Sequence, residues 1–142
     1  TEHPMGCFVD TTILFSFSYH LDPLNEASER ALEPLYRSDI QIFTNITVRS
    51  EFLEQHRRVL IPECLIDFYQ DFQNMLPESI ALKLQSHRTS YRRKLEEEKS
   101  VKFDPHQIKN FRLLLSQLTS KKENGWELLC RNYLDGKMGP LW

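Results

Sequence analysis

The chain has 142 residues, which is enough for one domain with its own hydrophobic core. Its hydrophobic content is 40%, and no run approaches the roughly 18 consecutive apolar residues that a membrane-spanning helix needs. The formal net charge of −2 hides an asymmetry, because residues 81–122 carry 11 bases and 4 acids whereas residues 1–80 are acidic. A basic region of this kind can form an anion-binding patch, or it can be the solvated face of a helix.

The three cysteines, Cys7, Cys64 and Cys130, are far apart and lie among apolar neighbours. Their spacing fits neither a zinc site nor a disulfide framework. We therefore expect buried free thiols in a reducing compartment, and a cytoplasmic protein. His56 and His87 fall on or beside apolar helix faces, so we expect them to pack there rather than to bind a metal.

The first third of the chain predicts two strands separated by two helices. Residues 7–10, CFVD, predict a short buried strand because the apolar residues are consecutive and do not alternate with polar ones. A helix is expected directly after Asp10, and a second one with Asn25 as its N-cap. Residues 40–44, IQIFT, are β-branched and aromatic and predict the second strand.

From residue 46 onward the apolar residues recur at helical spacing only. The expected helices are residues 46–60, a stretch after Pro62 that reaches Leu76, one that Pro77 starts and that reaches Leu95, one that Asp104 caps and that reaches Leu118, and residues 126–134, ending near Gly136. The motif DPHQ at residues 104–107 is a strong helix start, with Asp as N-cap, Pro at the first position and Gln at the third.

This order of elements favours an α/β fold with a short parallel sheet and many flanking helices. Two strands alone do not form a parallel sheet that can be buried on both faces, and nothing after Leu60 has strand character. We therefore expect a single domain over residues 1–142 that is C-terminally incomplete, with its C-terminal strands absent from this chain. Residues 77–122 are expected to be a helical, basic, insertion-like region.

Asp10 and Glu51 are the candidate metal-binding acids. Asp10 ends the first strand, where open α/β sheets bind ligands, although a carboxylate beside a helix N-terminus can also be only a cap. Glu51 lies in the first turns of the helix after the second strand, on the flank of the face that carries Val48 and Phe52. Two carboxylates brought together by separate elements repel each other unless a cation lies between them, and their oxygens suit Mg²⁺ or Mn²⁺.

The stretch FVDTTILFSF, followed by IFTNITVRSEFLEQ at residues 42–55, resembles the first half of a PIN domain, the family that includes the VapC-type toxins of bacterial toxin–antitoxin pairs. Asp10 and Glu51 match the family's first two metal-binding acids, and Thr11 matches the hydroxyl residue that follows the first acid. Thr12 stands where the family usually has Asn. The resemblance covers roughly residues 5–60.

The resemblance implies a PIN-like fold and a metal-dependent endoribonuclease. Asp10 and Glu51 would hold Mg²⁺ or Mn²⁺, Thr11 and Thr12 would support them, and RNA phosphodiesters would be the substrate. It also implies an antitoxin or a second copy of the chain as possible partners. No membrane partner is expected.

The family has further acids that this chain does not show at matching positions. Asp67 and Asp71 lie opposite the apolar stripe of their helix and are expected to be solvated. Asp104 is better explained as an N-cap, and Asp135 is a weak candidate.

Arg88, Arg92, Arg93 and Lys94 are the candidate RNA-binding residues within the basic region. Arg88 and Arg92 are four residues apart, so both are expected on one exposed side of a helix, while Tyr91 belongs to its apolar stripe. The alternative is a solvated face whose charges pair with residues 96–98.

Two other functions stay open. The chain can be a PIN-like binding or scaffold protein that has lost catalysis, which would differ at the further acids. It can also be a helical protein-interaction module, in which Asp10 caps a helix and Glu51 is a surface residue.

Overall fold

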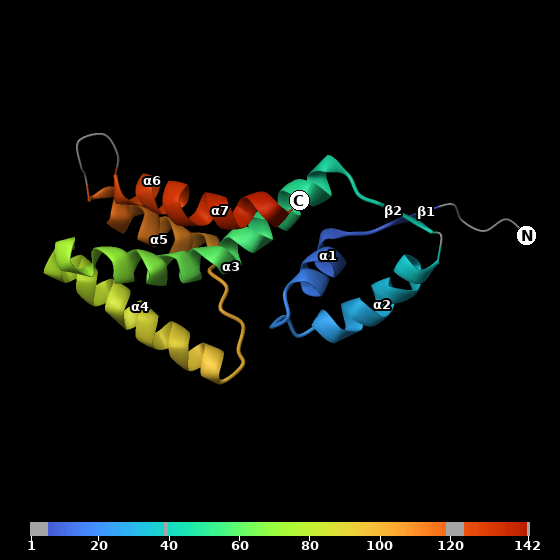
Figure 1. Cartoon of the computed structure of the whole chain (residues 1–142), viewed down its shortest axis with the longest axis horizontal. Helices are drawn as coiled ribbons and strands as arrows, with labels where there is room; N and C mark the ends of the chain where they lie inside the picture. The colour runs from blue at the N-terminus through green and yellow to red at the C-terminus, as the bar shows by residue number, and fades with distance from the viewer. Residues whose placement is uncertain (1–5, 39, 119–123, 142) are drawn as a thin grey trace, which may run out of the picture. The chain divides into compact units, whose positions relative to one another are not determined.

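The computed structural model describes residues 6–38, 40–118 and 124–141. The chain divides into two compact units, Thr1–Gln55 and His56–Trp142, and helices make up most of both (Figure 1). None of the helices in the described part combines the length and the apolar character that crossing a membrane requires.

The first unit is a two-stranded parallel sheet with helices. Its elements are β1 (Gly6–Phe8), α1 (Thr11–Ser18), α2 (Asn25–Arg37), β2 (Gln41–Phe43) and the beginning of α3 (Ile46–Phe72) (Figure 1). Cys7 pairs with Ile42 in the parallel register, and the N–H of Val9 donates to the carbonyl of Phe43 at 3.0 Å. Because parallel strands need a long crossover, α1 and α2 supply the connection. The expected mostly helical α/β architecture with a short parallel sheet is therefore confirmed.

Asn25 has a different role from the expected one. Leu24 occupies the N-cap position of α2 and makes no side-chain cap bond. The Asn25 amide nitrogen instead donates to the carbonyls of Ser16 at 2.7 Å and Phe17 at 3.1 Å, in the last turn of α1. Carbonyls at a helix C-terminus lack partners within their own helix, so Asn25 satisfies them and ties α1 to α2.

The second unit is built from helices around one core. After the main part of α3 come η1 (Gln73–Met75), α4 (Glu78–Glu96), α5 (Pro105–Ser116), α6 (Gly125–Leu129), the π-helical η2 (Cys130–Leu134), α7 (Asp135–Met138) and η3 (Gly139–Leu141). The core consists of the buried residues Ile61, Cys64, Leu65, Phe68, Ile80, Leu84, Phe103, Ile108, Leu115, Trp126, Leu129 and Leu134.

The C-terminal helical stretch extends beyond its expected end. Gly136 lies inside α7, and helical turns continue to Leu141. A glycine that ends a helix usually adopts a positive φ, and no described glycine does so. The expected end near Gly136 is therefore wrong.

The expected break at Pro62 is also wrong, because α3 runs through it. Proline has no N–H, so the carbonyl of Arg58, four residues earlier, has no helical donor. The N–H of Phe103 donates to this carbonyl at 2.9 Å, and the Arg58 Nε donates back to the carbonyl of Phe103 at 2.6 Å. The segment between α4 and α5 thus satisfies the acceptor that Pro62 leaves open.

The helix start at Asp104 is confirmed. Its carboxylate accepts from the N–H of Gln107 at 2.8 Å, and the Gln107 side-chain oxygen accepts from the N–H of Asp104 at 3.0 Å. Pro105 is the first helical residue. This reciprocal capping box satisfies two donors that the helix itself cannot pair.

The cysteines are free thiols with unequal burial. Cys64 is fully buried, and this burial raises the pKa of its thiol to about 12. Burial also raises the pKa of Cys130, although that residue is only half-buried. Cys7 is half-buried as well, because its strand has a single neighbour among the described residues, so the expected full burial holds only for Cys64.

His87 packs among aromatic rings of the second unit, as expected. Its ring centroid lies 5.2 Å from that of Phe103 and 5.5 Å from that of Phe111, and its Nε2 is 3.1 Å from the carbonyl oxygen of Pro62. Burial, and to a smaller extent the charge of Lys94, lower the pKa of His87.

His87→Gln should flatten the pH dependence of stability. Since the pKa of His87 is lowered in the folded state, the unfolded chain binds the proton more readily. The contribution of His87 is complete above its ordinary pKa of 6.5 and is lost as the pH falls below it. Urea unfolding between about pH 7 and pH 5 should therefore show a shallower loss of unfolding free energy in the variant, since glutamine does not titrate.

The matched control is His106→Gln, because His106 is exposed on α5. It makes the same change of side chain at a position in solvent. His56 also has a pKa lowered by burial, so some pH dependence should persist in the His87 variant. Equal slopes in the two variants would show that His87 is not held neutral.

Candidate functional site at Asp10, Thr11 and Glu51

Asp10 and Glu51 approach the same residue, Thr11. The Oδ1 of Asp10 accepts from the N–H of Thr11 at 2.8 Å, and the Oε2 of Glu51 accepts from the Thr11 hydroxyl at 2.7 Å. Thr11 is buried, whereas both acids are exposed. The fold therefore brings two acids from separate elements to one residue. One acid meets the backbone N–H of Thr11, and the other meets its side-chain hydroxyl.

The parallel sheet explains this placement. Asp10 follows β1 with an extended backbone and is the N-cap of α1. Glu51 lies in the early turns of α3, which follows β2 and is held by the buried Val48 and Phe52. Because parallel strands end at the same edge of the sheet, the two acids are delivered to that edge.

The capping role of Asp10 and a ligand-binding role are compatible. The cap uses one carboxylate oxygen of Asp10, and Thr11 uses one oxygen of Glu51. The second oxygen of each acid has no hydrogen-bond partner among the described residues. Each acid thus keeps one oxygen available for a cation.

The residues fit Mg²⁺ or Mn²⁺ in an open site. Mg²⁺ is commonly held by one or two carboxylates with waters and substrate phosphates, and exposed acids leave room for these. Among residues 6–38, 40–118 and 124–141 there is no group of three or more His, Cys, Asp or Glu residues that could hold a metal. Asp10 and Glu51 are two carboxylates, which is one ligand short of such a group.

Thr12 differs from Thr11 in its surroundings. Thr12 is exposed on α1, and its side chain makes no hydrogen bond among the described residues. The sequence resemblance named both threonines as supporting residues, but the bridging contact belongs to Thr11 alone. Only a structure could show this, because Glu51 is 40 residues away from Thr11.

The other aspartates do not join the pair around Thr11. The side chain of Asp67 is still 41% exposed, but it is not only solvated, because the Nζ of Lys137 lies 3.1 Å from its Oδ2. Asp71 is exposed, as expected, and accepts from the hydroxyl of Tyr133. Asp135 is exposed at the start of α7. The partner of Asp71 lies 62 residues further along the chain, and the partner of Asp67 lies 70 residues further. Both pairings therefore depend on contacts between distant helices.

The candidate RNA-binding residues all lie on α4, but they are not equally accessible. Arg88 is half-buried, its Nε is buried with no hydrogen-bond partner among the described residues, and its Cζ lies 5.8 Å from the centre of the Tyr69 ring. The expectation that Arg88 is exposed is therefore wrong, because a ring from α3 covers it. Arg92, Arg93 and Lys94 are exposed.

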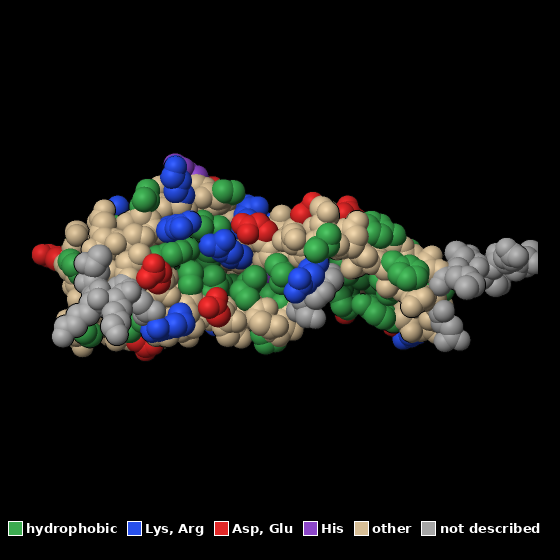
Figure 2. Space-filling view, turned by 90° about the horizontal axis from the view of Figure 1, so that it is seen from above, with side chains coloured by type: hydrophobic (Ala, Val, Ile, Leu, Met, Phe, Trp, Pro, Cys, Tyr) green, Lys and Arg blue, Asp and Glu red, His purple; other side chains and the backbone are tan. Residues whose placement is uncertain are grey.

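The face of the protein in Figure 2 carries side chains of both charges. On the face in Figure 2, patches of basic side chains are separated by acidic and apolar ones. Acidic and apolar side chains interrupt the basic ones there, so this face carries no continuous basic patch.

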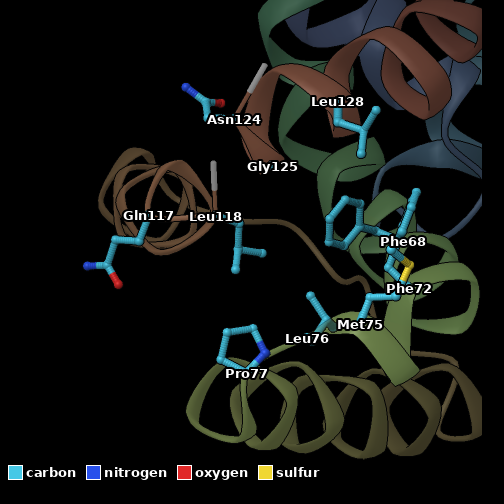
Figure 3. A pocket seen from close by; sticks show the side chains of 10 residues that line it. All are labelled: Phe68, Phe72, Met75, Leu76, Pro77, Gln117, Leu118, Asn124, Gly125 and Leu128. Carbon is cyan, nitrogen blue, oxygen red and sulfur yellow. The ribbon is translucent and has the colours of Figure 1, made fainter. Parts of the chain in front are cut away.

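The second unit also contains an apolar hollow of ≈ 500 Å³ (Figure 3). Phe68, Phe72 and Met75 lie on one side of it, and Gln117 and Asn124 lie on the other. Asn124 already caps α6, with its side-chain oxygen accepting from the N–H of Glu127 at 2.9 Å. None of the described residues that line the hollow is charged.

The sequence predicts two sets of charged functional groups: the metal-binding acids around Thr11 and the RNA-binding cations of α4. They belong to different units of the chain. Comparisons with protein-family models, with curated proteins and with solved structures find no match for this chain.

Proposed function

We propose that the protein is a metal-dependent endoribonuclease of PIN-domain type. The observation that supports this function most is the meeting of Asp10 and Glu51 at Thr11. An acid that directly follows a parallel strand and an acid on the helix after the neighbouring strand each keep an oxygen available. That arrangement agrees with the sequence resemblance of the first unit.

Asp10 and Glu51 would hold the divalent ion, and Thr11 would orient them. Its N–H and hydroxyl each occupy one oxygen of one acid, which fixes the direction of the other oxygen. The N-terminus of α1 favours negative charge on Asp10. When bound, the metal would supply an activated water and stabilise the charge that develops on an RNA phosphodiester.

A second candidate is a PIN-like binding or scaffold protein without catalysis. The small donor set favours it, since the described residues contain no group of three or more potential metal ligands. In that case Asp10 would serve as a helix cap, and Glu51 would serve to hold Thr11. Metal binding separates the two candidates.

Glu51→Gln should remove the effect of Mn²⁺ on stability. A ligand present at about 100 times its Kd raises the unfolding free energy of a protein by about 2.7 kcal/mol. Glutamine keeps an oxygen that can accept from Thr11 but loses the charge that binds the cation. Without metal the variant should be slightly more stable than the unmodified protein, because the repulsion from Asp10 is relieved.

Thermal unfolding with and without Mn²⁺ measures both effects, and Mn²⁺ line broadening of the Asp10 and Thr11 amide signals locates the ion. The matched control is Glu29→Gln, an exposed acid on α2 in the same unit, which should keep the full effect of Mn²⁺. The scaffold candidate would be supported if Mn²⁺ neither stabilised the unmodified protein nor broadened its Asp10 and Thr11 amide signals. A Glu51 variant that loses stability without metal would show that Glu51 has a structural charge partner.

A further inference from the structure

A small cavity of ≈ 90 Å³ lies between α4 and the segment that leads into α5. Its polar lining residues are His87, Ser90, Tyr91, Lys94, Lys102 and Gln107. Buried Phe103 is part of its apolar wall. The same segment is anchored to α3 through the two hydrogen bonds between Arg58 and Phe103, so the walls of the cavity are tied together.

The cavity is lined by cations and not by acids. Lys94 and Lys102 both line it, and no described lining residue is acidic. The ammonium group of Lys94 makes no ion pair with any described residue. His87 and Lys94 both line the cavity, so the ammonium group and the imidazole ring share one wall. An anion would supply the counter-charge that Lys94 lacks among the described residues.

Uncharged donors accompany these cations. The side-chain oxygen of Gln107 is engaged by the N–H of Asp104, which leaves its NH₂ group to donate. The hydroxyl of Ser90 has no hydrogen-bond partner among the described residues. Asp104, the acid beside this segment, does not line the cavity, and one of its oxygens accepts from the N–H of Gln107. The capping box therefore orients the side-chain NH₂ group of Gln107 and engages one carboxylate oxygen of Asp104.

The size of the cavity selects the kind of anion. A volume of ≈ 90 Å³ equals the share of about three water molecules in liquid water, which suits one tetrahedral oxyanion and not a nucleoside. Lysine is a common phosphate ligand because its compact charge can meet several oxygens. We infer that this cavity binds one phosphate group, with Lys94 and Lys102 as cations and Gln107 and Ser90 as hydrogen-bond donors.

The phosphate can come from two sources, free inorganic phosphate or the backbone of a nucleic acid. The inference does not depend on the acids around Thr11, since it concerns the second unit. Titration of the full chain with inorganic phosphate, followed by calorimetry and by the amide signals of His87 and Ser90, tests the site directly. Titration with a single-stranded RNA oligonucleotide, at several salt concentrations, tests the second source.

Gln107→Glu is the sharpest variant. Glutamate can replace glutamine in the capping box, so the helix start should persist, but it adds a negative charge to the cavity wall. Lys94→Gln removes a cation and keeps a polar side chain that is only one atom shorter. Each variant should weaken phosphate binding by about tenfold or more, because a charged hydrogen bond is lost or opposed.

Lys83→Gln is the matched control, because Lys83 is exposed on α4 and does not line the cavity. It should bind phosphate like the unmodified protein. If a nucleic acid is the source, phosphate should compete with RNA, and the two cavity variants should weaken RNA binding with a smaller salt slope. If free phosphate is the source, the variants should lose phosphate binding and keep their RNA affinity. Two results together would overturn the inference. The amide signals of His87 and Ser90 in the unmodified protein would not respond to phosphate, and both variants would bind RNA as tightly as the unmodified protein does.

Discussion

Asp10→Asn should abolish metal-dependent RNA cleavage while leaving the fold intact. Asparagine is as good an N-cap as aspartate, and its side-chain oxygen can still accept from the N–H of Thr11. The neutral amide, however, no longer contributes a charge to a divalent ion. Since the metal would supply several kcal/mol of transition-state stabilisation, the rate should fall by about a thousandfold or more.

The matched control is Asp22→Asn. Asp22 also lies in the first unit, and its Oδ1 accepts from the N–H of Leu24 at 2.8 Å, so the same change is made at another turn. It should keep the cleavage rate. Initial rates on a single-stranded RNA with Mn²⁺ measure activity, and thermal unfolding measures the fold. An Asp10 variant that cleaves at the unmodified rate would contradict the metal-ligand role, and one that unfolds would make Asp10 structural.

Features set by short-range interactions could be predicted from the sequence. The capping box of Asp104 and Gln107 depends on residues three positions apart, and it forms as expected. The parallel pairing of two short strands followed from consecutive apolar and β-branched residues. The approach of Asp10 and Glu51 to one edge followed from the geometry of parallel strands, because both acids are placed by strand ends.

Features set by contacts between distant elements could not be predicted. Pro62 stays inside α3 because Phe103, from a later segment, donates to the carbonyl of Arg58 that proline leaves open. Arg88 is covered by Tyr69 from another helix, and Asp67 meets Lys137 only because the C-terminal helices pack against α3. Helical periodicity gives the face of a residue on its own helix, but not which neighbour covers that face.

Phe68→Ala should strongly destabilise the second unit. Phe68 is 2% exposed in the middle of the core, and its ring centroid lies 4.9 Å from that of Phe72 and 6.3 Å from that of Tyr133. Truncating a buried phenylalanine to alanine costs about 3–5 kcal/mol, since packing contacts are lost and the surroundings collapse only in part. Small domains are stable by only about 5–15 kcal/mol, so this variant should lose a large part of its stability.

Urea unfolding followed by the fluorescence of Trp126, which belongs to the same core, measures this loss. A Trp142→Phe background confines the signal to Trp126. Met75→Ala is the matched control, because Met75 lines the same hollow as Phe68 but is 79% exposed. Its effect should stay within about 0.5 kcal/mol, as for most surface substitutions. Equal effects of the two variants would mean that Phe68 is not a central core residue, because Phe68 is buried and Met75 is exposed at the same hollow.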